Sequence, residues 1–410
     1  MAHHERGHWR PGVEHHGRSR AERTECDYDA YLPDPLHGRP LTLTGPLAAD
    51  LADAERAVTE LNIQPANLDD LESLARVLLR ADAVASSRME GIATDAGRLY
   101  SAESDQLKGR IARRDMNAIE ILGNINAMRH ALDEIAPKPR VELEDLLEIH
   151  RQLMRETRLA DIAGQIRTKQ NWIGTNPWHP CNAEFIPPPP QALSGLLADL
   201  VEYINDDNHP ALAHAALAHA QFETLHPFAD GNGRVGRVLI HLILRRRGLA
   251  PRYVPPISLA LAANASLYVE GLTATRYLGA PDSQAATAGI ARWLETFTGA
   301  TLRATIEAGA FALELQELDT QWRRQVSPRK NSAADLLIAR LPQYPILTAR
   351  TAALITGRTD PAAHQAINQL AAAGVLRPIT TAARYRAYEA PLLLDALADF
   401  EERLNNSPAR

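Results

Sequence analysis

Apolar and polar residues alternate along most of this chain with the three- to four-residue spacing of amphipathic helices. Apolar side chains recur in this way between Leu71 and Ala85 and again through residues 301–324. The nearly continuous apolar run at 238–244 indicates a helix that is buried on most sides. Strand-like runs are short and few, so the pattern predicts a mainly α-helical fold.

Two segments depart from the helical pattern. Short β-prone pieces within 164–174 and at 184–186 flank a turn rich in Asn and Pro, which predicts an isolated β-hairpin. Near the C-terminus, two helices separated by a turn precede strand-like runs at 375–379 and 384–388. A helix-turn-helix followed by a hairpin resembles a winged helix.

These patterns divide the chain into five expected regions. The first is polar, rich in His and Arg, and is expected to be disordered. The expected regions are a disordered tail at 1–27, a helical region at 28–139, a helical core at 140–299, a linker helix at 300–326 and a winged-helix-like unit at 327–410.

Composition and charge narrow the setting of the protein. The 410 residues are 45% hydrophobic and carry a formal net charge of −6, which does not favour general affinity for nucleic acid or anionic membranes. No apolar run approaches the length of a membrane-spanning helix, so we expect no membrane partner. Cys26 and Cys181 are the only cysteines. Two cysteines give no disulfide framework, and we therefore expect reduced thiols and a cytoplasmic protein.

The most informative stretch is His-Pro-Phe-Ala-Asp-Gly-Asn-Gly-Arg-Val-Gly-Arg at 226–237, which leads directly into the apolar run. A glycine-rich turn at the start of a helix presents free backbone N–H groups at the positive end of the helix dipole, which favours anions. The side chains add hydrogen bonding, forked positive charge, a ligand for a hard cation and a base. The residues with these capacities are Gly231, Asn232, Gly233, Arg234 and Arg237 for the anion, Asp230 for the cation and His226 as the base.

This stretch resembles the signature of the Fic/Doc family, His-Pro-Phe-x-(Asp/Glu)-Gly-Asn-Gly-Arg-x-x-Arg, and every fixed position is matched. The resemblance implies a Fic-type helical bundle with a β-hairpin flap that transfers AMP from ATP, with Mg²⁺, to a Tyr, Ser or Thr hydroxyl of a protein, including itself. It further implies that His226 is the general base, that Asp230 binds Mg²⁺, that residues 231–234 line the anion hole, and that Arg237 binds the γ-phosphate.

A second motif, Ser-Ser-Arg-Met-Glu-Gly at 86–91, ends the helix that contains Leu71. Ser86 and Glu90 are four residues apart and therefore share one helix face. The motif resembles the Fic inhibitory motif, (Ser/Thr)-x-x-x-Glu-(Gly/Asn). This resemblance implies that Glu90 pairs with Arg237 and displaces the γ-phosphate. In some relatives the same glutamate supports removal of AMP, so the reverse reaction remains open.

The resemblance also suggests how partners bind. The hairpin at 164–186 is similar to the Fic flap, which holds a target segment as an added strand. Tyr268 occupies a position comparable to those that contribute to the adenine pocket, although a half-buried aromatic in an amphipathic helix is an equal interpretation. A homodimer is compatible with the family, and no residue here specifies it.

Two alternatives remain open at this stage. Within enzymes, nothing in the motif fixes the nucleotide, so transfer of UMP, phosphate or phosphocholine competes with AMP transfer; the intact Arg237 argues against the phosphate-transferring Doc branch. In another class, the chain is a DNA-binding regulator with a non-catalytic Fic scaffold. The C-terminal unit from 327 onwards has ten basic and seven acidic residues, a small excess for DNA binding, so association with protein is an equal expectation.

Overall fold

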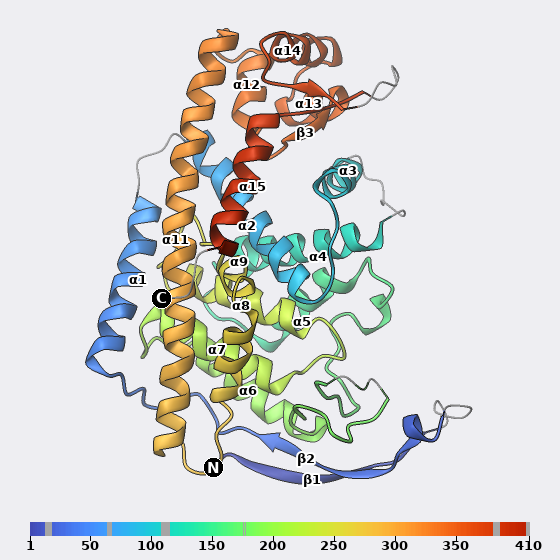
Figure 1. Cartoon of the computed structure of the whole chain (residues 1–410), viewed down its shortest axis with the longest axis vertical. Coiled ribbons are helices and arrows are strands. Elements are labelled where there is room, and N and C mark those ends of the chain that lie inside the picture. Colours follow the sequence, from blue (N-terminus) through green and yellow to red (C-terminus); the bar gives the residue numbers. More distant parts are fainter. Residues whose placement is uncertain are drawn as a thin grey trace.

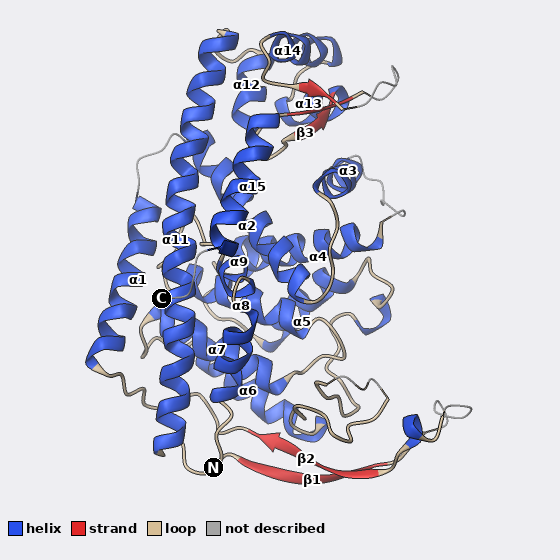
Figure 2. Cartoon of the chain, viewed as in Figure 1, coloured by secondary structure: helices blue, strands red, loops and turns tan. Residues whose placement is uncertain are grey.

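The computed structural model describes the chain except for residues 13–18, 64–67, 108–114, 175, 177, 380–385 and 407–410. As predicted, most described residues are helical and the strands are few and short (Figure 2). The elements up to the signature helix are β1 (His3–Trp9), β2 (Cys26–Leu32), α1 (Gly45–Ile63), α2 (Leu68–Met89), α3 (Ala96–Leu107), α4 (Met116–His130) with a π-helical extension (Ala131–Ile135), α5 (Leu143–Met154), α6 (Leu193–Ile204), α7 (Ala211–Leu225) and α8 (Asn232–Arg246).

The second half of the chain is dominated by one very long helix. Figure 1 shows α11 running along the long axis of the molecule, with the β1–β2 hairpin near one end and the C-terminal unit near the other. The remaining elements are α9 (Ile257–Ala262), α10 (Ala265–Ala274), α11 (Gln284–Val326), α12 (Ala333–Arg340), β3 (Ile346–Thr348), α13 (Ala349–Thr356), α14 (Asp360–Ala372), β4 (Arg377–Pro378), β5 (Ala387–Glu389) and α15 (Pro391–Asn406).

One expected boundary does not hold. A border at 299/300 would fall inside α11, which begins at Gln284 behind the capping side chain of Ser283 and continues without interruption to Val326. Buried apolar residues from Leu36 to Leu404 also form one continuous cluster, so the N-terminal, central and C-terminal regions share a core. The helical spacing near residue 301 located a helix correctly but could not show that this helix already begins at Gln284.

The expected disordered tail at 1–27 is also wrong over its described residues. Strands β1 and β2 pair antiparallel from His3↔Leu32 to Trp9↔Cys26. Most side chains of β1 are exposed, so its sequence lacks the apolar alternation that identifies a half-buried strand. Cross-strand ion pairs, such as Arg6 with Asp27 at 2.7 Å, occupy the polar positions instead.

The C-terminal unit has the element order expected for a winged helix. Helices α12, α13 and α14 accompany a three-stranded antiparallel sheet in the order β3-β5-β4, and the part of the predicted hairpin at 380–385 lies outside the described residues. This unit packs against α2. Ser73 Oγ donates a hydrogen bond to the carbonyl of Ala339, and Arg80 donates to the carbonyl of Gln343. The helix that bears Glu90 is therefore held between the central core and the C-terminal unit.

Candidate active site

The loop between α7 and α8 changes direction at two left-handed residues. His226 ends α7 with φ 47° and ψ 57°, and Gly231 begins α8 with φ 78° and ψ 7°. The left-handed conformation is costly for a side-chain-bearing residue such as His226, and it turns the imidazole away from the helix. The loop between these two residues leads directly into the first backbone N–H groups of α8, where the sequence predicts an anion site.

Asn232 braces this loop from within. Its Oδ1 accepts a hydrogen bond from the backbone N–H of Phe228 at 2.8 Å, and its Nδ2 donates to the carbonyl of the same residue at 2.9 Å. The side chain is 2% exposed. The structure therefore shows the Asn232 amide supporting the loop. Nδ2 carries a second N–H beyond this bond, and a hydrogen bond from it to a phosphate remains a prediction.

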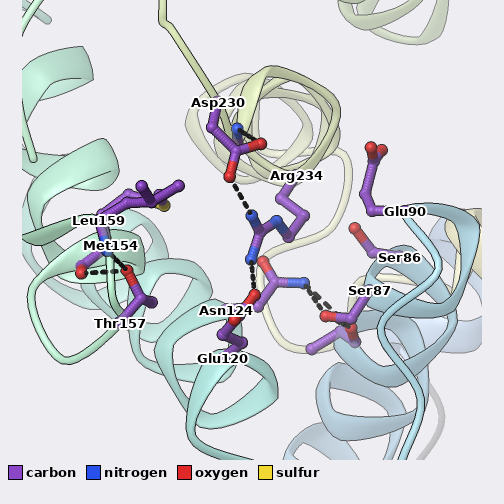
Figure 3. A network of polar contacts seen from close by, with 12 residues as sticks. Ser86, Ser87, Glu90, Glu120, Asn124, Met154, Thr157, Leu159, Asp230 and Arg234 are labelled. Atoms are coloured by element: carbon purple, nitrogen blue, oxygen red, sulfur yellow. Dashed lines mark hydrogen bonds and ion pairs between the residues drawn. The ribbon is translucent and has the colours of Figure 1, made fainter. Parts of the chain in front are cut away.

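Arg234 retains hydrogen-bonding capacity that the protein does not use. Its side chain is buried, with Nη2 3.8 Å from Asp230 and Nη1 3.5 Å from Glu120 (Figure 3). Both distances are long for hydrogen bonds, and Nε and Nη1 have no hydrogen-bond partner. A buried guanidinium with unmade bonds is a strong site for an oxyanion. Asp230, which is half exposed, lies at the outer end of this chain of charges.

Arg237 makes three hydrogen bonds to the second motif. Its Nε donates to Ser86 Oγ at 2.8 Å, and its Nη2 donates to the Ser86 carbonyl at 2.8 Å and to Glu90 Oε1 at 2.7 Å. The pairing expected from the family motif is present, although one oxygen of Glu90 makes it rather than both. Figure 3 shows Ser86 in the last turn of α2 and Glu90 directly after it, across from Arg234 and Asp230.

The Glu90 carboxylate also lies over the glycine-rich turn. A Cβ atom on Gly233 would collide with Glu90 Oε1. Burial opposes ionisation of Glu90, but the positive charges of Arg237 and Arg234 outweigh it and lower the pKa of this carboxyl. An anionic group of the protein therefore fills the position that the turn and its arginines would offer to a phosphate.

Burial shifts the pKa of two titratable groups beside the turn towards their neutral forms. Burial lowers the pKa of His226 to about 4, with the carbonyl of Glu223 partly offsetting the effect. Burial likewise raises the pKa of the Glu223 carboxyl to about 7, although the charge of Arg237 opposes the shift. A neutral imidazole at physiological pH can accept a proton, which is the capacity that a general base requires.

Several residues that the sequence reasoning did not single out connect the loop to the flap. Arg167 is buried, and it donates to the carbonyls of His226 at 2.8 Å and Pro188 at 2.6 Å. Asn171 donates to the carbonyls of His226 and Phe228 at 3.3 and 3.1 Å. Each is a polar residue in a segment predicted only as a hairpin, and nothing local distinguished them from solvent-facing side chains.

His150 of α5 supports the other side of the loop. Its ring stacks on Phe228 with centroids 3.9 Å apart, its Nδ1 accepts from the Gly164 N–H, and its Nε2 lies 3.1 Å from the Asp230 carbonyl. Burial lowers the pKa of His150 to about 4, so the ring is neutral. With Nδ1 as acceptor, Nε2 carries the proton and donates it to Asp230. His150 thereby fixes both the flap base and the turn.

The predicted flap is present in a minimal form. Ile173 and Phe185 exchange backbone hydrogen bonds of 2.8 and 3.1 Å and make a single antiparallel bridge. On the outer side, Tyr31 of β2 donates to the carbonyl of Ile186 at 2.9 Å. Since successive residues of a strand point their backbone groups to opposite edges, β2 covers the edge of 184–186 that faces away from Ile173.

A disulfide joins the N-terminal hairpin to the flap. Cys26 of β2 is bonded to Cys181, with Cα atoms 5.9 Å apart. The expectation of two reduced thiols is therefore wrong, and the argument from it to a reducing cytosol no longer holds, because disulfides persist in oxidising surroundings. The spacing of two cysteines 155 residues apart contains no sign that strand pairing will bring them together.

Tyr268 lies behind the site rather than at an open surface. It is 6% exposed, and its hydroxyl is 2.9 Å from His219 Nε2 within the core. Burial raises the pKa of this phenol well above its usual range, while the charge of Arg237 opposes the shift. The position beside Arg237 is therefore structural in this conformation, and contact with a base remains a prediction.

Neither a metal cluster nor a membrane helix is found among the residues that the structure describes. No three His, Cys, Asp or Glu side chains gather into a metal site in this part of the chain. No described helix combines the length and apolarity needed to cross a membrane.

Comparisons with known proteins agree with this geometry. The sequence model described as "Fic/DOC family" matches residues 140–244, and that of "Fic/DOC family N-terminal" matches residues 48–133. A protein adenylyltransferase fic-1 of Caenorhabditis briggsae is 33% identical over 158 residues, covering 37% of this chain and 29% of the relative. A protein adenylyltransferase Fic of Drosophila erecta is 33% identical over 140 residues, covering 33% and 26%. The chain thus spans less than a third of the length of these two relatives.

Solved structures agree on the fold. A Fic family protein from Desulfovibrio desulfuricans aligns with a TM-score of 0.50 at 21% identity, over 86% of this chain and 98% of that one. A Fic domain containing signaling protein from Bacteroides thetaiotaomicron aligns with a TM-score of 0.51 at 17% identity, over 65% and 97%. Through its matched regions at 48–133 and 140–244, and through a site that contains the whole signature, the chain carries Fic/DOC family domains.

Proposed function

We propose that this protein is an adenylyltransferase that moves AMP from ATP to a protein hydroxyl and is restrained by Glu90. The observation that carries the proposal is the Glu90 carboxylate, which lies over Gly233 and bonds to Arg237 at 2.7 Å. A site built for an oxyanion is filled by the protein's own anion. Relatives named protein adenylyltransferase share the matched region, which supports this chemistry over other group transfers.

In the proposed reaction the target hydroxyl oxygen attacks the α-phosphorus of ATP. A new P–O bond forms, the bond to the pyrophosphate leaving group breaks, and His226 takes the hydroxyl proton on its neutral ring. The unused donors of Arg234 and the N–H groups at the start of α8 stabilise the charge that develops on the phosphate oxygens. Arg237 would bind the terminal phosphate once Glu90 withdraws.

Mg²⁺ fits the residues present, although they do not build a complete cage. Asp230 supplies one half-exposed carboxylate beside the turn. Mg²⁺ is commonly held by one or two carboxylates together with waters and substrate phosphates, so one acidic residue at this place is sufficient. When bound, the ion would neutralise phosphate charge. Asp230 would hold it in position beside Arg234.

The target would add as a strand to the open edge of the flap. Because β2 covers the outer edge of 184–186, the remaining edge is that of Trp172 and Gly174, whose backbone groups make no hydrogen bond with other described backbone. Asn171, next in the chain, bonds to the His226 carbonyl at 3.3 Å, so this edge adjoins the base. Main-chain pairing there would bring a target hydroxyl to His226 with little dependence on target sequence.

The test is an intact-mass measurement after incubation with ATP and Mg²⁺. We expect an AMP-sized gain in Glu90→Gly, a much smaller gain in the wild type and none in Glu90→Gly/His226→Ala. A mass gain with UTP or CTP but not with ATP would change the nucleotide in the proposal and leave the mechanism as it is. No transfer with any nucleotide, together with DNA binding that survives His226→Ala, would replace the proposal with the scaffold alternative.

A further inference from the structure

A second pocket lies away from the signature loop. It has a volume of about 310 Å³ and is enclosed by α2, the end of α4 with its π-helical extension, the end of α8 and the segment after α8. This is the size of a small-molecule site. The charged residues that line it are four arginines, Arg76, Arg129, Arg245 and Arg252, and two acids, Glu72 and Asp133.

The positive charges in this pocket are not balanced. Arg76 bonds to Glu72 at 2.6 Å, and Glu72 is further shared with Arg340 of α12 at 3.2 Å. By contrast, neither Arg129 nor Arg245 lies within 4.0 Å of an acidic oxygen of any residue the structure describes. Nε of Arg245 is enclosed and has no hydrogen-bond partner. Partly buried cations without a directly paired acidic side chain are costly, and folded proteins seldom keep them without a use.

A structural explanation covers only one of the two arginines. Arg245 is in the last turn of α8, where the negative end of the helix dipole favours a cation. Arg129 has no such position, because the helical backbone continues past it through Ala131–Ile135. Burial lowers the pKa of both guanidinium groups, while the charge of Asp133 partly offsets this for Arg245.

We propose that this pocket binds a small phosphate-bearing anion. Arg129 and Arg245 would hold the phosphate with their planar forks, and Arg76 and the exposed Arg252 would close over it at the mouth. The apolar part of the lining, which includes Met128, Leu132 and Val254, would accommodate an organic portion of the ligand.

Because of where the pocket lies, a ligand bound in it would affect the inhibitory contact between Glu90 and Arg237. Arg76 is on α2, about 20 Å along the helix from Glu90, and Arg245 is on α8, two turns beyond Arg237. Next to the pocket, His241 of α8 bonds to Asp82 of α2 at 2.7 Å. An anion that bridges α2, α4 and α8 would hold α2 against α8 and favour the contact between Glu90 and Arg237. This consequence rests on the proposed function, whereas the binding itself does not.

The binding test is a calorimetric titration with inorganic pyrophosphate in the absence of divalent cations. It compares wild type, Arg129→Gln/Arg245→Gln and Gly233→Ala, the last of which obstructs the signature turn. We expect affinity to fall at least tenfold in the arginine double variant and to stay within about twofold in Gly233→Ala. Loss in Gly233→Ala alone, or no binding to the wild type, would overturn the proposal.

Folding of the double variant is checked by its thermal midpoint. Because the two arginines lack acidic partners, we expect the midpoint without ligand to be unchanged or higher. Hydrogen exchange then tests the link to the brake: pyrophosphate should slow exchange of α2 amides in the wild type and not in the double variant. Binding without any change in the exchange of α2 amides would support the binding site and refute its regulatory role. Neither readout depends on AMP transfer.

Discussion

Replacing Glu90 by Gln should release the nucleotide site without changing the shape of the side chain. The substitution removes the charge that Glu90 places over Gly233 and weakens its bond to Arg237, which is 2.7 Å long. A hydrogen bond to a charged group contributes about 1.5–3 kcal/mol. Because 1.36 kcal/mol corresponds to a factor of ten, ATP should bind productively about 10- to 150-fold better.

The assay measures the initial rate of AMP incorporation and the dissociation constant of ATP in the same preparation. Glu60→Gln, the same substitution at an exposed position of α1, serves as the matched control and should leave both quantities unchanged. A second readout is stability, since Glu90→Gln removes the negative charge that is paired with the buried Arg237. We expect the thermal midpoint of Glu90→Gln to fall without ligand and to recover with saturating ATP.

The reasoning about Glu90 is refuted if Glu90→Gln shows the wild-type rate and the wild-type affinity for ATP. That result would mean that the carboxylate is displaced at negligible cost whenever ATP arrives. An increase in affinity without an increase in rate would instead show that the brake acts on binding and that another step limits transfer.

Three further outcomes are expected. Cys26→Ser/Cys181→Ser should lower the free energy of unfolding by up to about 5 kcal/mol, because the disulfide closes a separation of 155 residues. An unchanged midpoint in a denaturant titration would contradict this prediction. Arg167→Lys should lower kcat and change KM less, because a single ammonium cannot hold the carbonyls of both His226 and Pro188. An equal loss of kcat in a surface variant such as Arg56→Lys would argue against a positioning role. The pKa of Glu223 is raised from 4.5 to about 7, so the folded state binds a proton more tightly than the unfolded state does. The stability that this group contributes is therefore present below pH 4.5 and falls by about 3 kcal/mol as the pH rises through 7. Unfolding curves of Glu223→Gln should lack this decline, and a decline in the variant equal to that of the wild type would oppose the assignment.

The local sequence determined the loop and the helices around it. A run of His, Gly, Asn and Arg residues before an apolar segment specifies a turn and a helix start through short-range backbone preferences, and Gly231 is in the left-handed conformation that the turn needs. The spacing of Ser86 and Glu90 placed both on one face of α2, and both reach Arg237. Helical periodicity likewise predicted the mainly α-helical class, because it depends only on neighbours three and four residues apart.

The tertiary structure decided what depends on residues far apart in the chain. Cys26 meets Cys181 only because β2 runs along the flap, and Arg129 meets Arg245 only because α4 packs beside α8. Strand β1 is polar and mostly exposed, so its order comes from pairing with β2 rather than from its own pattern. Local preferences fix the conformation of a turn or a helix, whereas burial, charge balance and pairing are properties of the packed chain, and single-sequence patterns do not contain them.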